Sequence, residues 1–528
     1  VGSNSDDTRI RSNRVGLAAS TSDPGTASEG DIYYDSTNNK VKTYDGSSWS
    51  AIQGSGTVEV VASGSLSNGA TVVINTDGTV SVVGTTDPGT PTFGSATVFE
   101  SANTQETAAT FDTANGKVVI AYRDNGNSNY GTAIVGTVSG TSISFGSAVV
   151  YASSASYDPA LTYDSTNGKV VIAYRDSGNS QYGTAIVGTV SGTSISFGSA
   201  VVFESSDTRD ADAIFDSTNN KVVITYRDSG NSNYGTAIVG TVSGTSISFG
   251  SAVVFESAGC YNSSATFDSS NGKVVVAYRD DGNSNYGTAI VGTVSGTSIS
   301  FGTAVVFNSA TTTQIGAGFD SSNGKVVIAY RDGGNSEYGT AVVGTVSGTS
   351  ISFGTAVLFT DSDGRFNTVT FDSNTNRIII SYYDDGNSNY GTAVEGSVTG
   401  TAVTFGSPVV FESADIGDKS ATFDSTNNKV VIAYNDNGNS AYGTAIVATS
   451  TISTNLTSEN FIGFSDAAYS DGDTANIQII SSVDDAQSGL TTGSKHYVQN
   501  DGTLSTTAGD PSVLAGTAIS GTEILIKQ

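Results

Sequence analysis

The chain has 528 residues with a formal net charge of −28, and it contains 63 glycines but one cysteine, one histidine and one tryptophan. Its length favours two or more structural units. The sequence has no cluster of lysine and arginine that could displace counterions from phosphate, so nucleic-acid binding is excluded, and no apolar run long enough to span a bilayer, so membrane insertion is not expected.

The N-terminal part contains one recognisable element, the stretch GDIYYDSTNNKVKTYDGSSWSA at residues 30–51. It predicts a β-hairpin whose second strand ends near Trp49. We therefore expect residues 1–54 to form a segment with a hairpin attachment module. Residues 55–90 are expected to be a β segment that packs with a C-terminal β-domain at residues 450–528.

A repeat of 52 residues occupies residues 91–449 and recurs seven times without an insertion or deletion. One marker is an aromatic residue followed by aspartate, at Phe111, Tyr163, Phe215, Phe267, Phe319, Phe371 and Phe423. The other is a phenylalanine followed by glycine, at Phe93, Phe145, Phe197, Phe249, Phe301, Phe353 and Phe405.

Each repeat is rich in β-branched residues and predicts four strands, as in ATFDS, KVVIAYRD, TAIVGTVSG and SISFGSAVVFES. A period of this length with four strands fits a propeller blade. The predicted fold is all-β: a seven-bladed β-propeller of four-stranded blades with small flanking β-domains. An open solenoid is the alternative.

The two ends of the repeat array indicate closure. The array begins with a fourth strand, Phe93 to Ser101, and finishes after a third strand, Thr444 to Thr449. One blade is thus divided between the two ends, and pairing across this seam would remove the exposed edges.

The loop DxGNSxYG follows the second strand, and its Asp124, Gly126 and Tyr130 resemble the repeats of Asp-box propellers, the sialidase-like group. The aromatic residue is one position late and the loop has no tryptophan, so the resemblance guides only the turn. The aspartates are expected to accept backbone hydrogen bonds. A Ca²⁺ ion would need more oxygen ligands than each loop offers, so no metal or other cofactor is predicted.

One connection differs in every copy, as in SDTRDAD, AGCYNSS and ATTTQIG, whereas the other turns are nearly constant. It is predicted to be a loop from the fourth strand of one blade to the first strand of the next, on the same face as DxGNSxYG. Two interpretations stay open: a surface loop that drifts because nothing packs on it, or a diversified recognition surface. The candidate binding residues are Tyr157, Asp158, Arg209, Asp210, Tyr261, Asn262, Gln314, Arg365, Phe366 and Lys419.

Five blades end their second strand with arginine, where the last two blades have Tyr383 and Asn435. These arginines either pair with neighbouring loop aspartates or form a ring that binds carboxylated sugars. They are Arg123, Arg175, Arg227, Arg279 and Arg331.

Catalysis is not expected. His496 is the only histidine and is predicted to lie on the surface of a strand, and Cys260 has no histidine near it in sequence. A glycosidase needs only two carboxylates, but in a near-symmetric ring Glu106 and Asp212 stand out only as loop acids. No catalytic residue is therefore assigned.

Residues 30–51, 55–84 and 455–528 resemble segments of tail and fibre proteins of tailed bacteriophages. The resemblance implies a virion appendage, homo-oligomeric, that contacts other virion or filament proteins through its N-terminal and C-terminal modules. We therefore expect a virion-borne or extracellular adhesion protein that binds a host-surface glycan or protein. The alternatives are a sialidase-like glycan-degrading enzyme and a subunit of a bacterial extracellular surface filament.

Overall fold

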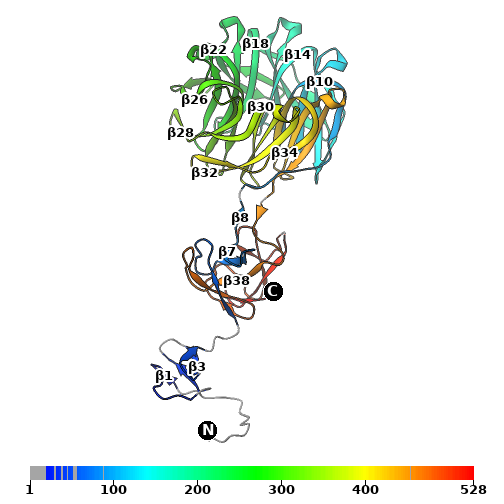
Figure 1. The fold of residues 1–528 in the computed structure, drawn as a ribbon. Helices are drawn as coiled ribbons and strands as arrows, with labels where there is room; N and C mark the ends of the chain where they lie inside the picture. Colours follow the sequence, from blue (N-terminus) through cyan, green and yellow to red (C-terminus); the bar gives the residue numbers. More distant parts are fainter. Residues whose placement is uncertain are drawn as a thin grey trace. The chain divides into compact units, whose positions relative to one another are not determined.

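The computed structural model describes residues 19–28, 31–36, 40–44, 46–51, 56–86, 88–451, 453–509 and 511–527. It contains two compact units, Val1–Thr85 with Thr454–Gln528, and Thr86–Ser453. Apart from short 3₁₀ turns, the described residues of both are strands and connections (Figure 1). None of the described residues belongs to a helix long and apolar enough to cross a membrane.

The N-terminal element is a small sheet in which β1 (Ala19–Ser20) pairs with β2 (Ile32–Asp35), β2 with β3 (Lys40–Tyr44), and β3 with β4 (Trp49–Ala51). The predicted end of the second strand near Trp49 is wrong. A turn containing Gly46, with a φ of 94°, intervenes, so Trp49 begins a third strand.

Two further sheets join segments that are distant in sequence. One contains β5 (Thr57–Val61), β39 (Thr474–Gln478), β38 (Phe461–Ser465), β6 (Thr71–Ile74) and β7 (Val80–Val82), in that order. The other contains β40 (Val483–Asp484), β44 (Ile524–Ile526), β43 (Val513–Ala518), β41 (Lys495–Val498) and β42 (Leu504–Ser505).

The two sheets share an apolar core that includes Val73, Phe464 and Ile524. His496 on β41 is only 3% exposed, and its Nε2 accepts a hydrogen bond from the Thr491 N–H at 3.3 Å. The prediction of a surface position for this histidine is wrong, because its side chain is enclosed and held by the preceding turn.

The strands within residues 92–449 form one ring-like sheet of repeated units, and β8 (Thr85–Thr86) pairs with β37 (Ser453–Thr454) in a separate two-stranded sheet. The first strand of each unit is long: β10 (Thr97–Asp112), β14 (Val149–Asp164), β18 (Val201–Asp216), β22 (Val253–Asp268), β26 (Val305–Asp320), β30 (Val357–Asp372) and β34 (Val409–Asp424). The second is β11 (Lys117–Asp124), β15 (Lys169–Asp176), β19 (Lys221–Asp228), β23 (Lys273–Asp280), β27 (Lys325–Asp332), β31 (Arg377–Asp384) or β35 (Lys429–Asp436).

The third strand is β12 (Tyr130–Ser139), β16 (Tyr182–Ser191), β20 (Tyr234–Ser243), β24 (Tyr286–Ser295), β28 (Tyr338–Ser347), β32 (Tyr390–Thr399) or β36 (Tyr442–Thr449). A short strand follows it, β13 (Ser142–Phe145), β17 (Ser194–Phe197), β21 (Ser246–Phe249), β25 (Ser298–Phe301), β29 (Ser350–Phe353) or β33 (Ala402–Phe405).

The predicted fourth strand and the predicted variable loop both need correction. β12 pairs first with β13 and then with the beginning of β14, so the fourth strand is broken in two. The second half of β14 pairs with β15 of the next unit. The variable connection is therefore the middle of a continuous strand. This strand pairs with β12 up to Ala155 and with β15 from Ser156 onward, with a register shift between Tyr157 and Ala160.

The two ends of the array pair as the sequence predicts. β36 pairs antiparallel with β10, with Ala445 opposite Thr97, and also with β9 (Thr92–Phe93), with Ala448 opposite Phe93. This pairing closes the sheet into a ring around an axis (Figure 1). The inner edge of each unit is the second half of its long strand.

Both sequence markers have physical causes. The buried Asp112 carboxylate accepts hydrogen bonds from the N–H groups of Ala114 and Asn115, both at 3.0 Å, and so fixes the turn after the aromatic residue. A Cβ at Gly146 would lie 1.8 Å from the carbonyl oxygen of Thr193 in the next unit. Only glycine fits where neighbouring units approach so closely.

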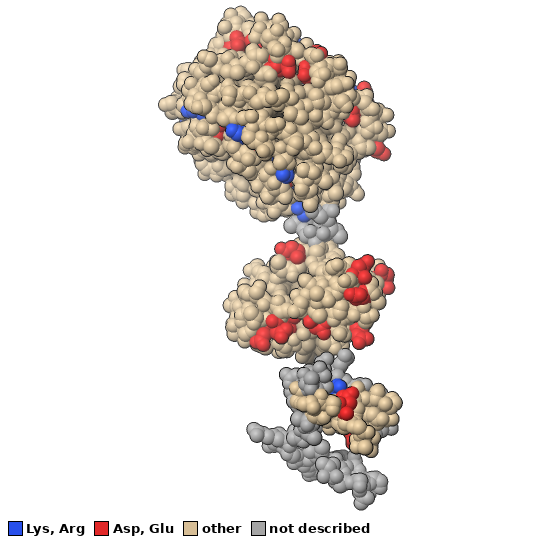
Figure 2. Space-filling model, turned by 90° about the vertical axis from the view of Figure 1, so that its left-hand side faces the viewer, with Lys and Arg blue, Asp and Glu red and all other residues tan. Residues whose placement is uncertain are grey.

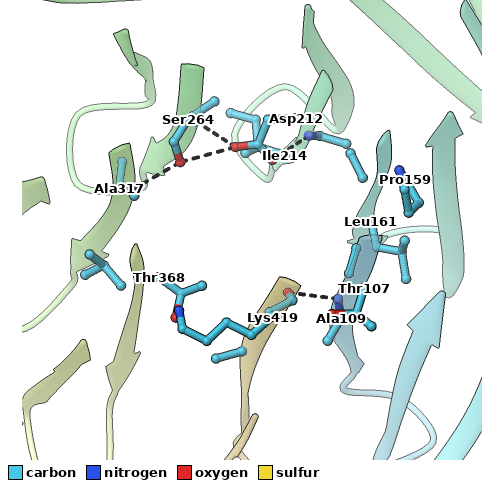
Figure 3. A pocket seen from close by; sticks show the side chains of 18 of the residues that line it. Thr107, Ala109, Pro159, Leu161, Asp212, Ile214, Ser264, Ala317, Thr368 and Lys419 are labelled. Carbon is cyan, nitrogen blue, oxygen red and sulfur yellow. Dashed lines mark hydrogen bonds between the residues drawn. The ribbon is translucent and has the colours of Figure 1, made fainter. Parts of the chain in front are cut away.

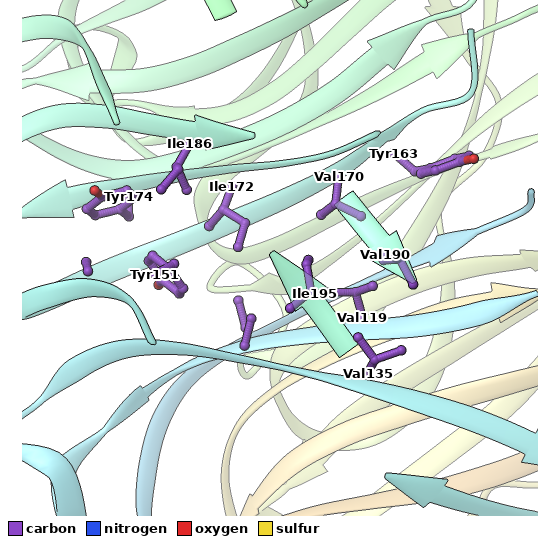
Figure 4. Packing of buried hydrophobic residues seen from close by; sticks show 13 residues of the cluster. Val119, Val135, Tyr151, Tyr163, Val170, Ile172, Tyr174, Ile186, Val190 and Ile195 are labelled. Carbon is purple, nitrogen blue, oxygen red and sulfur yellow. The ribbon is translucent and has the colours of Figure 1, made fainter. Parts of the chain in front are cut away.

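The apolar cores lie between successive units. One core combines Val119 and Val135 of one unit with Tyr151, Ile172 and Tyr174 of the next, all of them buried (Figure 4). Burial of a side chain of this size stabilises the fold by about 1.5–3 kcal/mol. Each unit thus depends on both neighbours, which makes the ring a rigid frame for its inner segments.

Candidate functional site: the mouth of the ring

The inner segments of the long strands surround a pocket of about 310 Å³ at the centre of the ring, here called the central pocket. Small residues such as Ala109, Ala265 and Ala317 form most of its wall. Asp212 and Lys419 bring the ionisable side chains, and Figure 3 shows them on opposite sides of the opening.

The backbone takes a left-handed conformation at the register shift of six long strands, just after each strand has changed sheets. Equivalent residues of six units have positive φ: Glu106 (53°), Asp158 (50°), Asp210 (48°), Asn262 (51°), Gln314 (56°) and Phe366 (52°). Asparagine and aspartate tolerate this region, whereas a bulky residue such as phenylalanine is an outlier there. We call this set, with Asp418 of the remaining unit, the mouth residues.

Side chains of the mouth residues connect neighbouring units. Glu106 Oε2 accepts a hydrogen bond from the Asp158 N–H at 2.8 Å, and Gln314 Oε1 accepts one from the Phe366 N–H at 3.0 Å. Asp418 Oδ2 accepts one from the Glu106 N–H at 3.1 Å, which carries the pattern across the seam.

In several units the residue after the mouth residue makes a second set of connections. Thr107 Oγ1 donates to the carbonyl oxygen of Asp418 at 3.3 Å, and Asn367 Nδ2 donates to that of Gln314 at 2.9 Å. Lys419 Nζ donates to the carbonyl oxygen of Phe366 and, at 2.7 Å, to that of Ser381. The variable segment is therefore packed, and it is not a surface loop on which nothing packs.

The arginines at the ends of the second strands have acidic partners. Arg227 Nε lies 2.9 Å from Asp210 Oδ2, and Arg331 Nε lies 2.5 Å from Asp363 Oδ1. Arg279 instead pairs with Asp281 of the following turn, at 2.9 Å. Two looser pairs join Arg123 to Glu106 at 3.4 Å and Arg175 to Asp158 at 3.5 Å. This geometry favours structural pairing for these arginines.

Two of the candidate residues are tyrosines that lie between pairs of arginines. The Tyr157 ring is 4.7 Å from the Arg123 guanidinium and 4.5 Å from that of Arg175. Tyr261 lies 4.5 Å from both Arg227 and Arg279. These cation–π contacts connect adjacent units, and each contributes about 0.5–2 kcal/mol depending on its exposure.

The constant turns carry out the role predicted for their aspartates. Asp124 Oδ1 accepts a hydrogen bond from the Asn127 N–H at 3.0 Å, and Asp228 Oδ1 accepts one from the Gly230 N–H, also at 3.0 Å. Asp384 makes no such cap. Within the described part of the chain, no three His, Cys, Asp or Glu side chains converge as metal ligands.

Charge divides the mouth into two sectors. The acidic sector contains Asp418, Glu106, Asp158 and Asp210; the neutral sector contains Asn262, Gln314 and Phe366. Beyond the mouth, Figure 2 shows few charged side chains on the visible side of residues 88–451. Acidic side chains gather on the unit that contains Val1–Thr85 and Thr454–Gln528, here called the flanking unit.

Burial shifts the protonation of three side chains at the mouth. Burial and the nearby Asp158 carboxylate raise the pKa of Glu106 to about 7. Burial raises the pKa of Asp212 to about 6, even though Asp212 Oδ2 accepts a hydrogen bond from the Ala265 N–H at 2.8 Å. Burial also lowers the pKa of the Lys419 ammonium well below its usual value.

A second pocket, of about 220 Å³, lies at the neutral sector and is here called the mouth pocket. It shares Ala211, Asn367, Thr368 and Lys419 with the central pocket. Five sequence-predicted residues line it, namely Asp210, Asn262, Gln314, Phe366 and Lys419. The remaining five are not among its lining residues: Tyr157, Asp158, Arg209, Tyr261 and Arg365.

The sequence did not single out Asn367, Ile315 or Ser263, which also line the mouth pocket. Each directly follows a mouth residue. One sequence signal could have indicated them. Asp, Asn and Gln, some of which tolerate a left-handed backbone, occur at the preceding position at the repeat spacing.

Comparisons with known proteins identify a fold but no family. No family model matches the sequence, and no curated protein matches it. A lectin from Burkholderia pseudomallei is similar in structure, with a TM-score of 0.51 and 10% identity, over 68% of this chain and 99% of the lectin.

A protein of unknown function from Dyadobacter fermentans aligns with a TM-score of 0.44 and 14% identity, over 68% of this chain and 99% of its own. At this level of identity, the similarity to the lectin concerns the fold alone. Together with the repeated units of the ring-like sheet, it fits a propeller-like fold.

Proposed function

We propose that this chain is a carbohydrate-binding protein and that its ring is a seven-bladed β-propeller. The flanking unit belongs to an extracellular or virion-borne appendage, in which several copies of the chain assemble with other appendage proteins. The mouth of the ring then attaches the appendage to a glycan of a host surface. The phage-like segments at residues 30–51, 55–84 and 455–528 support the assignment to an appendage.

The observation that carries the proposal is the contrast between constant and variable parts of the repeat. Strands and turns recur almost unchanged, whereas the segment at residues 206–212 and its equivalents differ in every unit. These segments surround the mouth, where side chains from all units approach a common centre. A rigid scaffold with varied residues at one place is typical of a recognition surface.

The chemistry of the mouth fits a sugar better than a protein or a nucleic acid. The mouth pocket offers amide side chains for hydroxyl groups and the exposed ring of Phe366 for an apolar sugar face. Binding pockets combine apolar walls with a few placed polar groups in this way. That the structurally similar protein is a lectin agrees with this choice.

A glycan-degrading enzyme is the rival function, and two carboxyl groups with raised pKa, those of Glu106 and Asp212, favour it. Both groups accept hydrogen bonds from backbone N–H groups of the next unit. They serve the ring as connectors. An assay for new reducing ends, after incubation with every glycan that binds, tests the rival, and release of such ends would establish it.

An array of immobilised glycans, probed with the full chain, tests the proposal. We expect binding to a defined subset of glycans. Replacing residues 206–212 and 362–368 with the equivalent residues 102–108 should abolish this binding and leave the thermal melting transition cooperative. If no glycan binds, or if the exchanged chain binds as the parent does, the proposal is wrong.

Imaging tests the appendage. Antibodies against the flanking unit should label fibres on virions or filaments on cells when viewed by electron microscopy. Label confined to the cell interior would contradict the localisation and leave glycan binding untouched.

A further inference from the structure

The mouth of the ring is symmetric in backbone and asymmetric in chemistry. The mouth pocket lies at the neutral sector, with Asp210 of the acidic sector at its edge. Its wall contains Asn262, Gln314 and Phe366 from three successive units, together with Asn367 and Lys419. The units of the acidic sector from Asp418 to Asp158 contribute no mouth residue to it. A sugar site in this pocket depends on the proposed function, and the pocket's chemistry defines the class of sugar.

Asn367 gives the most direct sign of a missing ligand. Its side chain is 6% exposed, and its Nδ2 donates to the carbonyl oxygen of Gln314 at 2.9 Å. Among the residues that the structure describes, no group donates a hydrogen bond to its Oδ1. A buried acceptor without a partner is costly, and this residue lines both pockets. This oxygen has almost no exposed surface, so a ligand hydroxyl would supply the missing donor once the Asn367 side chain turns toward the pocket.

Phe366 gives the second sign. It is 39% exposed, and its backbone has a φ of 52°. Its ring meets Tyr383 edge-on, with centroids 6.1 Å apart. A bulky aromatic side chain in this strained conformation and on the surface contributes little to the core, and strain of this kind is found at ligand sites.

Charge at the mouth pocket decides the class of sugar. Asp210 is already paired with Arg227 at 2.9 Å. The amine of Lys419 donates to the carbonyl oxygens of Phe366 and Ser381, and its burial disfavours the charged form. The lining residues thus provide no unpaired cation for a carboxylate, and Asp210 would repel one.

We propose that each chain binds one uncharged sugar residue in the mouth pocket, with its apolar face against Phe366 and one hydroxyl donating to Asn367 Oδ1. Gln314 and Asn262 are placed to hydrogen-bond further hydroxyls. The pocket of about 220 Å³ is smaller than the roughly 300–1,000 Å³ that drug-sized ligands occupy, which suits a single ring. The ring therefore holds one site, despite its repeats.

Titration of the full chain with single sugars tests this assignment. The uncharged probes are glucose, galactose, mannose, rhamnose and N-acetylglucosamine; the acidic probes are glucuronate and N-acetylneuraminate. We expect calorimetry to detect binding of at least one uncharged sugar and no acidic one, and native mass spectrometry to count one bound sugar per chain.

Two variants remove the proposed contacts and keep the backbone. Phe366→Asn introduces the residue found at the equivalent position of another unit, Asn262. Asn367→Thr introduces the equivalent of Thr107, whose hydroxyl still donates to the neighbouring carbonyl oxygen. Each should weaken binding about fivefold to tenfold or more. The control Asp158→Asn alters the equivalent of Phe366 in the acidic sector and should leave affinity unchanged.

The outcomes separate the two proposals. Three results would overturn the single neutral site and leave carbohydrate binding by the ring intact. They are binding that neither Phe366→Asn nor Asn367→Thr weakens, a preference for an acidic sugar, and a count near one sugar per repeat. No binding of any probe here, combined with no binding on the glycan array, removes the proposed function and this site together.

Discussion

The acidic and neutral sectors of the mouth have the same backbone, and they use it for different purposes. In the acidic sector, the Glu106 carboxylate connects two units through the Asp158 N–H and contacts Arg123. In the neutral sector, Gln314 makes the equivalent connection to the Phe366 N–H without any charge. One sector uses its carboxylates in contacts between units, whereas the other leaves the ring of Phe366 exposed and Asn367 Oδ1 without a donor. The comparison indicates that the constant parts of the repeat form the frame, and that positions where the repeat sequence changes form the site.

The largest expected effect comes from the position that follows each mouth residue, and it should differ between two neighbouring units of the acidic sector. Lys419→Ala removes a buried side chain and leaves two carbonyl oxygens without their donor. We expect a loss of about 3 kcal/mol in the free energy of unfolding. Thr107→Ala, the equivalent change in the neighbouring unit, should cost only about 1 kcal/mol. Urea unfolding of both variants measures the difference, and equal losses would contradict it.

Titration of Glu106 gives the acidic sector a pH dependence. Its pKa is raised from 4.5 to about 7, so the folded state holds the proton more tightly than the unfolded chain. Stability should therefore fall as the pH rises from about 4.5 to about 7 and then level off, by about 1–3 kcal/mol. Glu106→Gln keeps the acceptor and should flatten this part of the curve.

Melting temperatures of Glu106→Gln and the parent chain, measured across this pH range, provide the test. Asp212 and Glu395 also have raised pKa values. The melting temperature of Glu106→Gln should therefore still depend on pH, but less steeply than that of the parent chain. Identical slopes would show that Glu106 titrates in the folded state as it does in the unfolded chain.

Smaller effects than that of Lys419→Ala should come from the tyrosines between arginines. Tyr157→Leu and Tyr261→Leu keep an apolar side chain and lose two cation–π contacts each. Each should reduce the free energy of unfolding by about 1–2 kcal/mol, with Tyr→Phe variants as near-neutral controls. A clear difference between the two sites would mean that the acidic partners of Arg123 and Arg175 alter the contact.

The repeat predicted much of the fold, because its markers reflect strict geometry. The glycine of the Phe–Gly pair is required by the close approach of Gly146 to Thr193. The aspartate of the aromatic–Asp pair is required by the turn that Asp112 caps. The closure of the seam also followed from the split first repeat. The continuous strand through residues 206–212 was missed, because a register shift with positive φ leaves the same polar pattern as a loop.

The sequence predicted several residues of the candidate site, but it did not predict the contacts that they make. Asn262, Gln314 and Phe366 were chosen because they vary, and the structure places all three at one pocket. Asn367 was missed, since its importance lies in an Oδ1 that lacks a donor, and sequence carries no record of satisfied hydrogen bonds. The hydrogen bonds between units that the other variable residues make could not be derived from the sequence for the same reason.

A crystal structure of the full chain, soaked with the saccharide that binds best on the array, tests the single neutral site most directly. We predict density for one sugar per chain in the mouth pocket, against Phe366 and within hydrogen-bond distance of Asn367 Oδ1. Density at several equivalent positions around the ring, or only on its outer surface, would contradict the division of the mouth into a structural and a binding sector.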